Sequence, residues 1–534
     1  MDTDVSGLTI FGALKKAFQD HPSSPAYDFL GSRRTCGDMY ADIISFSDRL
    51  TYLGVKRGDR VAICLPNIPQ ALIAFYAVNR IGAVSVMVHP LSSPNELSFY
   101  VRDSDCKAAI ILDSLLGSFP EPGDDNGLSF VMPVSPYTML PPLKRLATVG
   151  KRLRISYSDS VVAWVGPTAP ATEPDTSPED TAVVLYTGGT TGTSKGAVHT
   201  NRSINSSMSC MLGLIDISEV SRVLSIMPLF HGFGLCTCIH APLCIGVECI
   251  LMPTFTIDSV CKAVVKKRID AIIGVPSLFK KMVENPFLAS SDLSFIRVMF
   301  CGGDLMSVSD LREMNAFFRE HGAAGVQVGY GLTETVAAVA VMPKGEYRED
   351  SVGLPLADHE VRIVGLGTAD EVPDGTEGEI CIRGPSLMAG YLDGSETADK
   401  VFMEHPDGHV WLHTGDIGEK DADGYLLFKG RFKRMIVTSG YNVYPAQVEN
   451  TLCRSPLVSE CCVIGVTDQF RGEKVKAFVV LADGVPPTDE TRDELRAFMR
   501  SNISAYSKPR EYEFVDTLPK TKVGKIDYRA LQDS

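Results

Sequence analysis

The sequence lacks the features that mark nucleic-acid-binding and membrane-spanning proteins. Its 534 residues carry a formal net charge of -14 without a sustained run of Lys or Arg, whereas a nucleic-acid backbone is bound by basic faces. No apolar run approaches the roughly 20 residues that a membrane-spanning helix needs. Asp2 and Asp4 stand where a secretory signal would be basic. We therefore expect a cytoplasmic protein without a nucleic-acid partner or an integral membrane segment.

Paired C-x-x-C motifs and internal repeats are also missing. The 14 cysteines are scattered along the chain, and several of them, such as Cys236, Cys238, Cys461 and Cys462, lie in apolar segments. This pattern favours reduced, buried thiols over a metal site.

The order of apolar segments predicts an α/β protein with more than one domain. A strand at Val61 to Leu65, a helix from Pro69 to Gly82 and a strand from Ala83 to Val88 form a β-α-β unit. Similar alternation resumes at Val223 and continues to a helix expected at Ser307 to His321. The stretch from Pro120 to Pro178 is rich in Pro, Ser and Thr, so we interpret it as connecting structure.

The pattern changes in the second half of the chain. Short strands and turns from Gly353 predict a β-rich subdomain over about 353–430, within an N-terminal domain of 1–430. The remaining 434–534 predict a small α+β domain, in which a helix presents Leu495, Phe498, Met499 and Ile503 on one face.

The stretch YTGGTTGTSKGA, from Tyr186 to Ala197, has the composition of a phosphate-binding loop. Its glycines let backbone N–H groups approach an anion, its hydroxyl groups add donors, and Lys195 adds a positive charge. The lysine spacing is not that of a Walker A loop, which disfavours a P-loop NTPase. A flexible linker is the alternative interpretation of this segment.

Two short motifs carry carboxylates suited to a nucleotide. GYGLTE, from Gly329 to Glu334, follows a strand and offers Glu334 as an oxygen ligand for Mg²⁺. HTGD, from His413 to Asp416, offers Asp416 as an acceptor for ribose hydroxyls. Taken alone, GYGLTE could equally be a plain turn, and Asp416 is more simply explained as a turn cap.

Three further positions are less specific. His231 lies in the apolar segment LFHGFG, where most histidines are core residues, and Gly302 and Gly303 follow Cys301 at a strand end where a flat base could approach the backbone. Lys525, in a Pro/Gly turn near the C-terminus, would ordinarily be solvated surface. It could also complete an anionic site when a small domain closes.

These motifs, together with GRFKRMIVTSGYNVYP and PKTKVGKID, occur in the order found in the adenylate-forming superfamily, which the whole chain resembles. That superfamily includes acyl-CoA synthetases, 4-coumarate-CoA ligases, firefly luciferases and adenylation domains of peptide synthetases. The GGTTG loop and SGYNVYPAQVE most resemble the fatty acyl-CoA ligase branch. The resemblance implies an AMP-forming ligase that joins a fatty or related apolar acid to CoA through an acyl-adenylate, with ATP, Mg²⁺ and CoA.

The resemblance also assigns roles to residues. It implies that the β- and γ-phosphates are held by Thr187, Gly188, Gly189, Thr190, Thr191, Gly192 and Lys195, the α-phosphate by Thr333, and Mg²⁺ by Glu334. Adenine would lie against Gly302, Gly303 and Tyr330, and the ribose against Asp416 and Arg431. Lys525 would bridge the attacking carboxylate and the α-phosphate, with Thr333 and Glu334 as further catalytic residues. Lys433 would be the hinge of a mobile C-terminal domain, Ser439, Gly440 and Tyr441 would contact CoA, and His231, Cys301 and Gly329 would line or gate the acyl pocket.

The sequence departs from the superfamily at two positions and leaves two alternatives open. Arg434 follows the hinge lysine where an acidic residue is common, and Cys301 stands where glycine is common, so its side chain could shorten the pocket and favour a medium-chain or compact acid.

One alternative acceptor is the phosphopantetheine of a carrier protein, although no carrier domain follows in this sequence. A non-catalytic nucleotide or acyl-adenylate binding protein would be expected to lose Lys525, Glu334 or Asp416, which are all present. The sequence does not distinguish a monomer from a homodimer.

Overall fold

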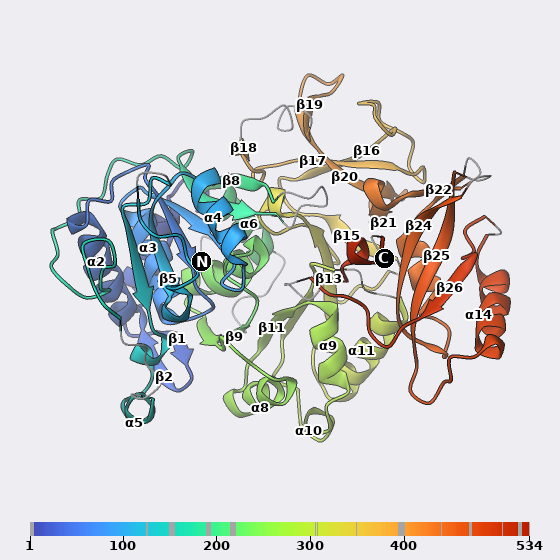
Figure 1. Cartoon of the computed structure of the whole chain (residues 1–534), viewed down its shortest axis with the longest axis horizontal. Coiled ribbons are helices and arrows are strands. Elements are labelled where there is room, and N and C mark those ends of the chain that lie inside the picture. Colours follow the sequence, from blue (N-terminus) through green and yellow to red (C-terminus); the bar gives the residue numbers. More distant parts are fainter. Residues whose placement is uncertain are drawn as a thin grey trace.

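A computed structural model shows a large N-terminal domain and a smaller C-terminal domain (Figure 1). It describes residues 5–123, 126–148, 155–187, 194–213, 220–304, 306, 308–348, 350–392, 401–438, 441–468, 472–504, 506–521 and 526–532. The predicted α/β architecture is confirmed, with helices packed against mixed sheets.

One sheet of the large domain has seven described strands, in the order β18-β8-β7-β4-β3-β5-β6. Strands β3 to β7 are parallel to their neighbours, whereas β8 and β18 run antiparallel at one edge. Their bounds are β3 Arg60–Cys64, β4 Val84–Met87, β5 Cys106–Leu112, β6 Phe130–Val134, β7 Thr181–Tyr186, β8 Gly196–Thr200 and β18 Gly390–Tyr391. The helices beside this sheet are α2 (Cys36–Tyr52), α3 (Pro69–Arg80) and α4 (Pro94–Asp103).

The predicted β-α-β unit is present as β3, α3 and β4, with β3 parallel to β4. Pro69 occupies the first turn of α3, where its missing N–H removes no helical hydrogen bond. All residues of α3 from Pro69 to Asn79 are buried. A helix that is apolar on every side is stable only when it is enclosed, and α3 therefore belongs to the interior of the large domain.

Strand β6 corrects the interpretation of 120–178 as connecting structure. Phe130, Met132 and Val134 are buried in the core, and β6 pairs in parallel with β5. Pro133 in the middle of this strand weakens its sequence signal, because proline cannot donate to a β-ladder. The strand tolerates Pro133 because it forms the edge of its sheet.

The second sheet has 14 described strands, in the order β16-β17-β20-β21-β15-β14-β13-β12-β11-β9-β10-β1-β2, with β19 paired to β20. Its bounds are β1 Pro25–Phe29, β2 Ser32–Thr35, β9 Arg222–Ser225, β10 Glu248–Leu251, β11 Ala271–Gly274, β12 Val298–Cys301, β13 Val326–Gly331, β14 Ala338–Val341, β15 Ser351–Pro355, β16 Glu360–Val364, β17 Gly378–Arg383, β19 Phe402–Glu404, β20 Val410–Lys420 and β21 Leu426–Arg431. The run from β1 through β10, β9, β11 and β12 to β13 is parallel, and the pairs from β13–β14 through β20–β21 are antiparallel. The predicted β-rich segment thus continues the edge of an α/β sheet.

The expected β-α alternation after residue 223 is confirmed by α8 (Ile257–Lys267), α9 (Pro276–Val283) and α11 (Val308–Glu320), with the short α10 (Pro286–Ala289) between them. These helices pack on one face of the parallel strands. The other face is covered by α6 (Asn201–Leu212), the π-helical segment η5 (Gly234–His240) and α7 (Ala241–Cys244). The apolar helical segment from Gly234 to Cys244 therefore begins as a π-helix and ends as an α-helix.

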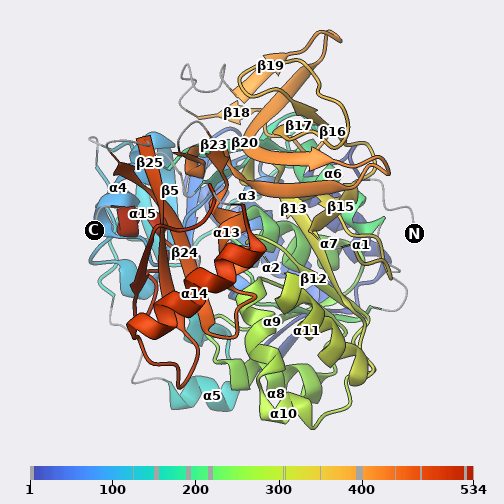
Figure 2. The ribbon, with the colours of Figure 1, turned by 90° about the vertical axis from the view of Figure 1, so that its right-hand side faces the viewer.

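The smaller domain is built on a separate sheet of five described strands, β22 to β26. The strands are β22 Ile436–Thr438, β23 Tyr441–Val443, β24 Val458–Asp468, β25 Gly472–Leu481 and β26 Glu511–Phe514. Helices α13 (Pro445–Leu452) and α14 (Asp489–Asn502) cover one face, and α15 (Tyr528–Gln532) packs on the other (Figure 2). Leu495 and Met499 of α14 are buried as predicted, with Phe498 and Ile503 partly buried beside them.

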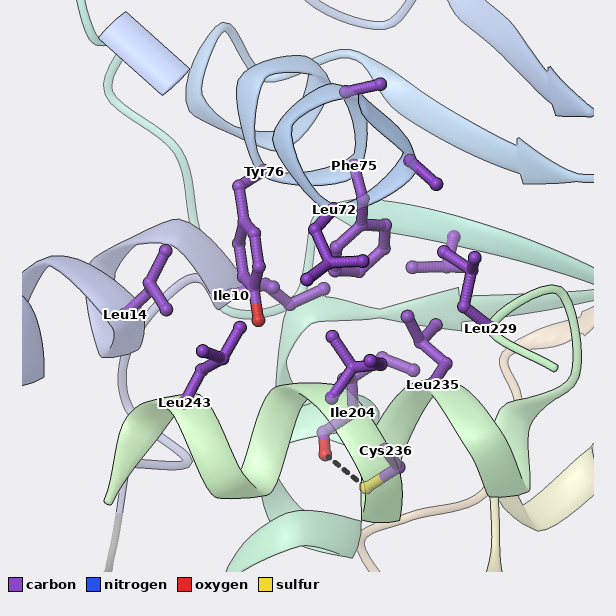
Figure 3. Close-up of a cluster of buried hydrophobic side chains, with 14 of the residues drawn as sticks. Ile10, Leu14, Leu72, Phe75, Tyr76, Ile204, Leu229, Leu235, Cys236 and Leu243 are labelled. Carbon is purple, nitrogen blue, oxygen red and sulfur yellow. Dashed lines mark hydrogen bonds between the residues drawn. The ribbon is translucent and has the colours of Figure 1, made fainter. Parts of the chain in front are cut away.

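The N-terminal helix α1 (Ile10–Asp20) docks on the core of the large domain. Its Ile10 and Leu14 join buried side chains of α3, α6, η5 and α7, as Figure 3 shows. Asn201 and Asn79 accept hydrogen bonds from the first backbone N–H groups of this helix, at 3.0 and 2.7 Å. None of the described helices has the length and apolar character needed to cross a membrane.

Candidate functional site

The predicted phosphate loop joins two antiparallel strands, β7 and β8. Thr187 N–H donates to the Lys195 carbonyl at 2.9 Å and closes the base of this hairpin. The tip, with Gly188, Gly189, Thr190, Thr191 and Gly192, lies outside the described residues. The loop follows β7, which is parallel to β4. It therefore emerges at the carboxyl end of the parallel strands, where α/β sheets bind ligands. The second strand of the hairpin, β8, pairs with β18.

Lys195 is connected to Glu334 through a tyrosine from a third segment. The Lys195 ammonium lies 5.0 Å from the ring centroid of Tyr391, in β18. The Tyr391 hydroxyl donates a hydrogen bond to Glu334 Oε1 at 2.7 Å. A cation over an aromatic face and a hydroxyl–carboxylate hydrogen bond thus join two motifs that are well separated in the sequence.

The turn that carries Thr333 and Glu334 is fixed by its own backbone and by a buried histidine. Thr335 Oγ1 bonds to Leu332 and Ala337, and Val336 has a φ of 66°. The Nε2 of His199 lies 2.8 Å from the Thr333 carbonyl. Burial lowers the pKa of His199 to about 4, so this imidazole is neutral near pH 7 and donates its Nε2 proton to that carbonyl. The turn is therefore held at Thr333 by a neutral hydrogen-bond donor.

Asp416 is buried and bound by residues from two other strands. The hydroxyl of Tyr330, in β13, donates to Asp416 Oδ2 at 2.8 Å, and Arg431 Nε, in β21, lies 3.2 Å from Oδ1. Burial raises the Asp416 pKa to about 6, against the opposing effect of Arg431. A carboxylate has about four acceptor positions, so Asp416 retains capacity for further donors.

Gly302, Gly303 and Gly329 keep side chains away from the ends of β12 and β13. A Cβ on Gly329 would come within 2.7 Å of the Phe300 ring and 2.9 Å of the Ala340 carbonyl. Gly303 has a φ of 83°, in the region that favours glycine. The close approach requires glycine at 329, and the backbone conformation favours it at 303.

A narrow apolar cavity of about 60 Å³ lies behind this edge of the sheet. Phe300 lines it, and a Cβ on Gly302 would lie 3.8 Å from the same ring. Phe300 therefore stands between the cavity and the strand ends. The other lining side chains come from α6, η5, α7 and the parallel strands, and they include Met211, Thr237, Ile245, Val247 and Ile273.

Cys301 does not line this cavity, and its expected role beside an acyl pocket stays a prediction. It packs with Leu278, Phe279 and Met282 in the core on the opposite face of β12 from Phe300. Successive side chains of a strand point to opposite faces, so the register of β12 assigns the cavity to Phe300.

The loop that carries His231 lies against the Thr333 turn. A Cβ on Gly232 would approach the Val336 carbonyl to 2.1 Å, so glycine permits this contact. His231 is half-buried, and its Nδ1 accepts a hydrogen bond from Phe233 N–H at 3.3 Å. The predicted gate residue is thus adjacent to the turn that carries Thr333.

The segment between the two domains is anchored to the smaller one by Arg434. Arg434 Nη2 lies 2.6 Å from Glu449 in α13 and 3.2 Å from the Val463 carbonyl in β24, and the guanidinium lies 4.7 Å from the Tyr528 ring centroid. Lys433 falls in the short helix η7 (Phe432–Arg434). Tyr441 lies in β23, whereas Ser439, Gly440 and Lys525 lie outside the described residues.

Sequence reasoning missed three residues that shape this site. Tyr391 belongs to a two-residue strand, His199 follows the phosphate loop, and Phe300 precedes the glycines of β12. A tyrosine or a histidine beside a motif carries little signal by itself. Of these three residues, only Phe300 could have been placed from the sequence, because alternating side chains of a strand point to opposite faces of the sheet.

Comparison with known proteins agrees with this architecture. Residues 14–392 match the AMP-binding enzyme family, and residues 447–525 match the AMP-binding enzyme C-terminal domain. A long-chain-fatty-acid--CoA ligase of Bacillus subtilis is 34% identical, with 96% of this chain and 91% of that protein covered. A feruloyl-CoA synthase of Amycolatopsis sp is 32% identical, with 95% and 94% covered. The crystal structure of a benzoate CoA ligase from Burkholderia xenovorans LB400 is 25% identical, with a TM-score of 0.81 over 98% of this chain and 99% of that one.

A large α/β domain and a small α+β domain, each matched by its family model, define an adenylate-forming protein, which confirms the resemblance seen in the sequence. The chain belongs to the AMP-binding enzyme family.

Proposed function

We propose that the protein is an ATP-dependent carboxylic acid–CoA ligase. The acid carboxylate attacks the α-phosphate of ATP to form an acyl-adenylate and diphosphate, and the CoA thiol then displaces AMP to give the acyl-CoA. The expectation of an acid–CoA ligase agrees with relatives that are CoA ligases or synthases and match at least 90% of the chain.

The observation that carries this proposal is a continuous set of contacts between separate motifs. Lys195 contacts Tyr391, which contacts Glu334, and the strand before Glu334 carries Tyr330, which binds Asp416. The cavity behind Phe300 offers a space for an apolar group next to the same edge. Positive charge, donors and carboxylates for a nucleotide therefore lie beside a space for an acyl group.

The residues act mainly by position and charge. Adenylation brings a carboxylate to an anionic triphosphate, so fixed donors and cations must offset the developing charge. Lys195 and the hydroxyls of its loop would hold the leaving diphosphate, and Thr333 would donate to the α-phosphate. Asp416 would accept the ribose hydroxyls with its remaining lone pairs while Tyr330 and Arg431 keep it oriented.

Glu334 fits the requirements of a Mg²⁺ ligand. It is a carboxylate, one of its oxygens is oriented by Tyr391, and the rest of its acceptor capacity is available. When bound, Mg²⁺ supplies positive charge to the phosphates of ATP. Glu334 itself would place that charge beside the Thr333 turn.

Lys525 would supply the charge for the first half-reaction from the smaller domain. The segment after it lies close to the site, because Tyr528 in α15 contacts Arg434 and acts electrostatically on Arg431, the partner of Asp416. The end of the chain, dark red in Figure 1, lies between the two domains. Rotation of this domain about Lys433 would remove Lys525 and bring Ser439, Gly440 and Tyr441 towards the CoA thiol.

This cavity favours a compact acid over one of medium length. A cavity of about 60 Å³ has room for only about two water-sized groups, since one water takes ~30 Å³. This argument replaces the one based on Cys301.

The 14 free thiols, most of them buried, are suited to a reducing compartment such as the cytoplasm.

The test is diphosphate release from the purified protein with ATP, Mg²⁺ and a panel of carboxylic acids, with and without CoA, together with mass spectrometry of the products. We expect multiple turnover only with CoA, and acyl-CoA as the product. If turnover does not depend on CoA and the protein acylates an added phosphopantetheinyl carrier protein, the protein is a carrier-loading enzyme instead. Binding of ATP without release of diphosphate for any acid would indicate a non-catalytic protein.

A further inference from the structure

Three potential metal ligands meet inside the β-rich part of the large domain, beside the strand that carries Asp416. Cys381 lies in β17, His413 in β20, and His405 in the turn between β19 and β20. One ligand atom from each lies within 4.8 Å of the other two, and all three residues are buried. Cys381 and His413 are direct cross-strand partners, so the sheet register itself brings them together.

The two imidazoles face each other through the same atom type. His405 Nε2 lies 3.0 Å from His413 Nε2. On the far side of its ring, His413 Nδ1 lies 2.9 Å from Glu379 Oε2. A carboxylate accepts hydrogen bonds and donates none, so His413 Nδ1 donates its proton to Glu379, and in the singly protonated ring Nε2 presents a lone pair to His405.

A cation or a proton must therefore stand between the rings. His405 could place its proton on Nε2 and donate to His413, and its Nδ1 has no hydrogen-bond partner among the described residues in either tautomer. If the proton is on Nδ1, two lone pairs face each other at 3.0 Å. A metal ion bound to both Nε2 atoms resolves that conflict, with the Cys381 thiol as its third ligand.

We propose that Cys381, His405 and His413 bind a soft or borderline transition-metal ion, for which Zn²⁺ is the probe. Zinc binds imidazole at ~2.0–2.1 Å and thiolate at ~2.3 Å, so the three ligand atoms, which lie within 4.8 Å of one another, can share one ion once their side chains adjust around it. On binding, the Cys381 thiol releases its proton to solvent, and the His405 proton occupies Nδ1. No electron transfer is involved.

The surroundings of the cluster have the form of an outer ligand shell. Metal-bound histidines usually donate their other N–H to a carboxylate, as His413 does to Glu379. The Trp411 ring stacks on His405 with centroids 5.4 Å apart. The nearby cation Arg362 is paired with Asp407 at 2.8 Å, which reduces its repulsion of a bound ion.

The position of the cluster suggests what the metal does. Glu379 also accepts a hydrogen bond from Gly415 N–H at 2.9 Å, one residue before Asp416. A metal that joins β17, β20 and the β19–β20 turn would brace the strand from which Asp416 projects. The metal acts as a structural brace of the nucleotide site and takes no part in the reaction.

The experiment uses the full-length protein after removal of metals by a chelator. Zn²⁺ is titrated in competition with a chromophoric chelator, and the melting temperature is followed with and without one equivalent of Zn²⁺. We expect one tightly bound ion per chain and a higher melting temperature with zinc. With Co²⁺ as a spectroscopic probe, we expect a thiolate-to-metal charge-transfer band and the ligand-field bands of a low-coordinate ion.

Variants assign the binding to these residues. Cys381→Ser and His405→Gln should lose the tight site, the cobalt thiolate band and the zinc-dependent melting shift. His409→Gln, an exposed histidine of the same turn, and Cys249→Ala, a buried thiol elsewhere, should keep all three. Glu379→Gln keeps the three ligands but loses the charge that supports His413, and should weaken zinc binding by about 10–100-fold.

If Cys381→Ser fails to fold, the zinc affinity of Glu379→Gln still tests the proposal. Zinc binding by the wild-type protein that is no tighter than binding by His405→Gln would overturn the proposal, as would a cobalt complex without a thiolate band. The pair would then be an ordinary N–H···N hydrogen bond. Equal zinc affinity in Glu379→Gln and wild type would likewise contradict it.

Discussion

The two oxygens of the Asp416 carboxylate are bound by different strands, and this arrangement controls its protonation. Burial raises its pKa from an ordinary 3.8 to about 6, while Arg431 and the Tyr330 hydroxyl act in the opposite direction and Glu334 and Glu379 raise it further. The folded protein therefore binds this proton more tightly than the unfolded chain. The contribution of Asp416 to the free energy of unfolding is present at low pH and is lost as the pH rises from about 4 to about 6.

The same protonation should affect catalysis. A protonated Asp416 loses its ion pair with Arg431 and part of its acceptor capacity, so we expect kcat/KM for ATP to fall below about pH 6. Tyr330→Phe retains the ring but removes the hydroxyl that lowers the Asp416 pKa, and should move this acidic limb to higher pH. The measurement is a pH profile of diphosphate release. An acidic limb that persists unchanged in Asp416→Asn would show that another group titrates.

Phe300 and Cys301 form a natural pair of variants, because they are adjacent in sequence but face opposite sides of β12. Phe300→Ala should join the apolar cavity to the strand ends and raise kcat/KM for longer acids relative to shorter ones by about 10-fold or more, since each accommodated methylene is worth ~1–3 kcal/mol. Cys301→Ala should leave that ratio unchanged. Competition assays with acids of increasing length make the comparison. A change in Cys301→Ala alone would place the acyl pocket on the other face of the sheet.

Among the structural elements, β18 makes a larger contribution than its two residues suggest. It pairs with β8 and thereby places Tyr391 between Lys195 and Glu334. Tyr391→Phe keeps the ring near Lys195 but removes the hydrogen bond to a carboxylate, which is worth ~1.5–3 kcal/mol. We expect kcat/KM for ATP to fall by about 10-fold or more, with half-maximal activity reached at a higher Mg²⁺ concentration. Tyr52→Phe, at an exposed tyrosine, is the control, and equal activity of the two variants would exclude this role for Tyr391.

The elements also show what local patterns predict and what they miss. Strand β3, helix α3 and strand β4 follow from apolar runs bounded by Pro69 and Gly82. Strand β6 does not, because Pro133 masks its pattern and the strand depends on pairing with β5 and with Val161, which are distant in sequence. The meeting of Tyr391 with Glu334 depends on a pairing between residues some 190 positions apart, which no local pattern encodes. The phosphate, magnesium and ribose roles were suggested by residue type and position and made specific by the family resemblance, and they stay predictions.

At the scale of the whole molecule, the division of charge between two domains should separate the half-reactions. Lys525 belongs to the small domain and Lys195 to the large one, so Lys525→Ala should reduce acyl-adenylate formation by about 100-fold or more, the typical loss of one charge-stabilising group. CoA acylation from a supplied acyl-adenylate should largely survive. Single-turnover assays of each step test this, with Lys520→Ala as a control at a lysine paired with Glu460 on the small domain. Equal loss of both steps would contradict the division.

Helix α1 imposes an order on the synthesis of this protein. Its buried face rests on Leu243 in α7, and the acceptors of its first N–H groups include Asn201. At ~5–20 residues per second, a ribosome needs roughly 10–50 s after α1 to make those partners. The nascent helix should therefore stay sensitive to protease, or bound to a chaperone, in translation-arrested chains that end before residue 201. It should become protected once the arrest point allows 201–245 to leave the ribosome.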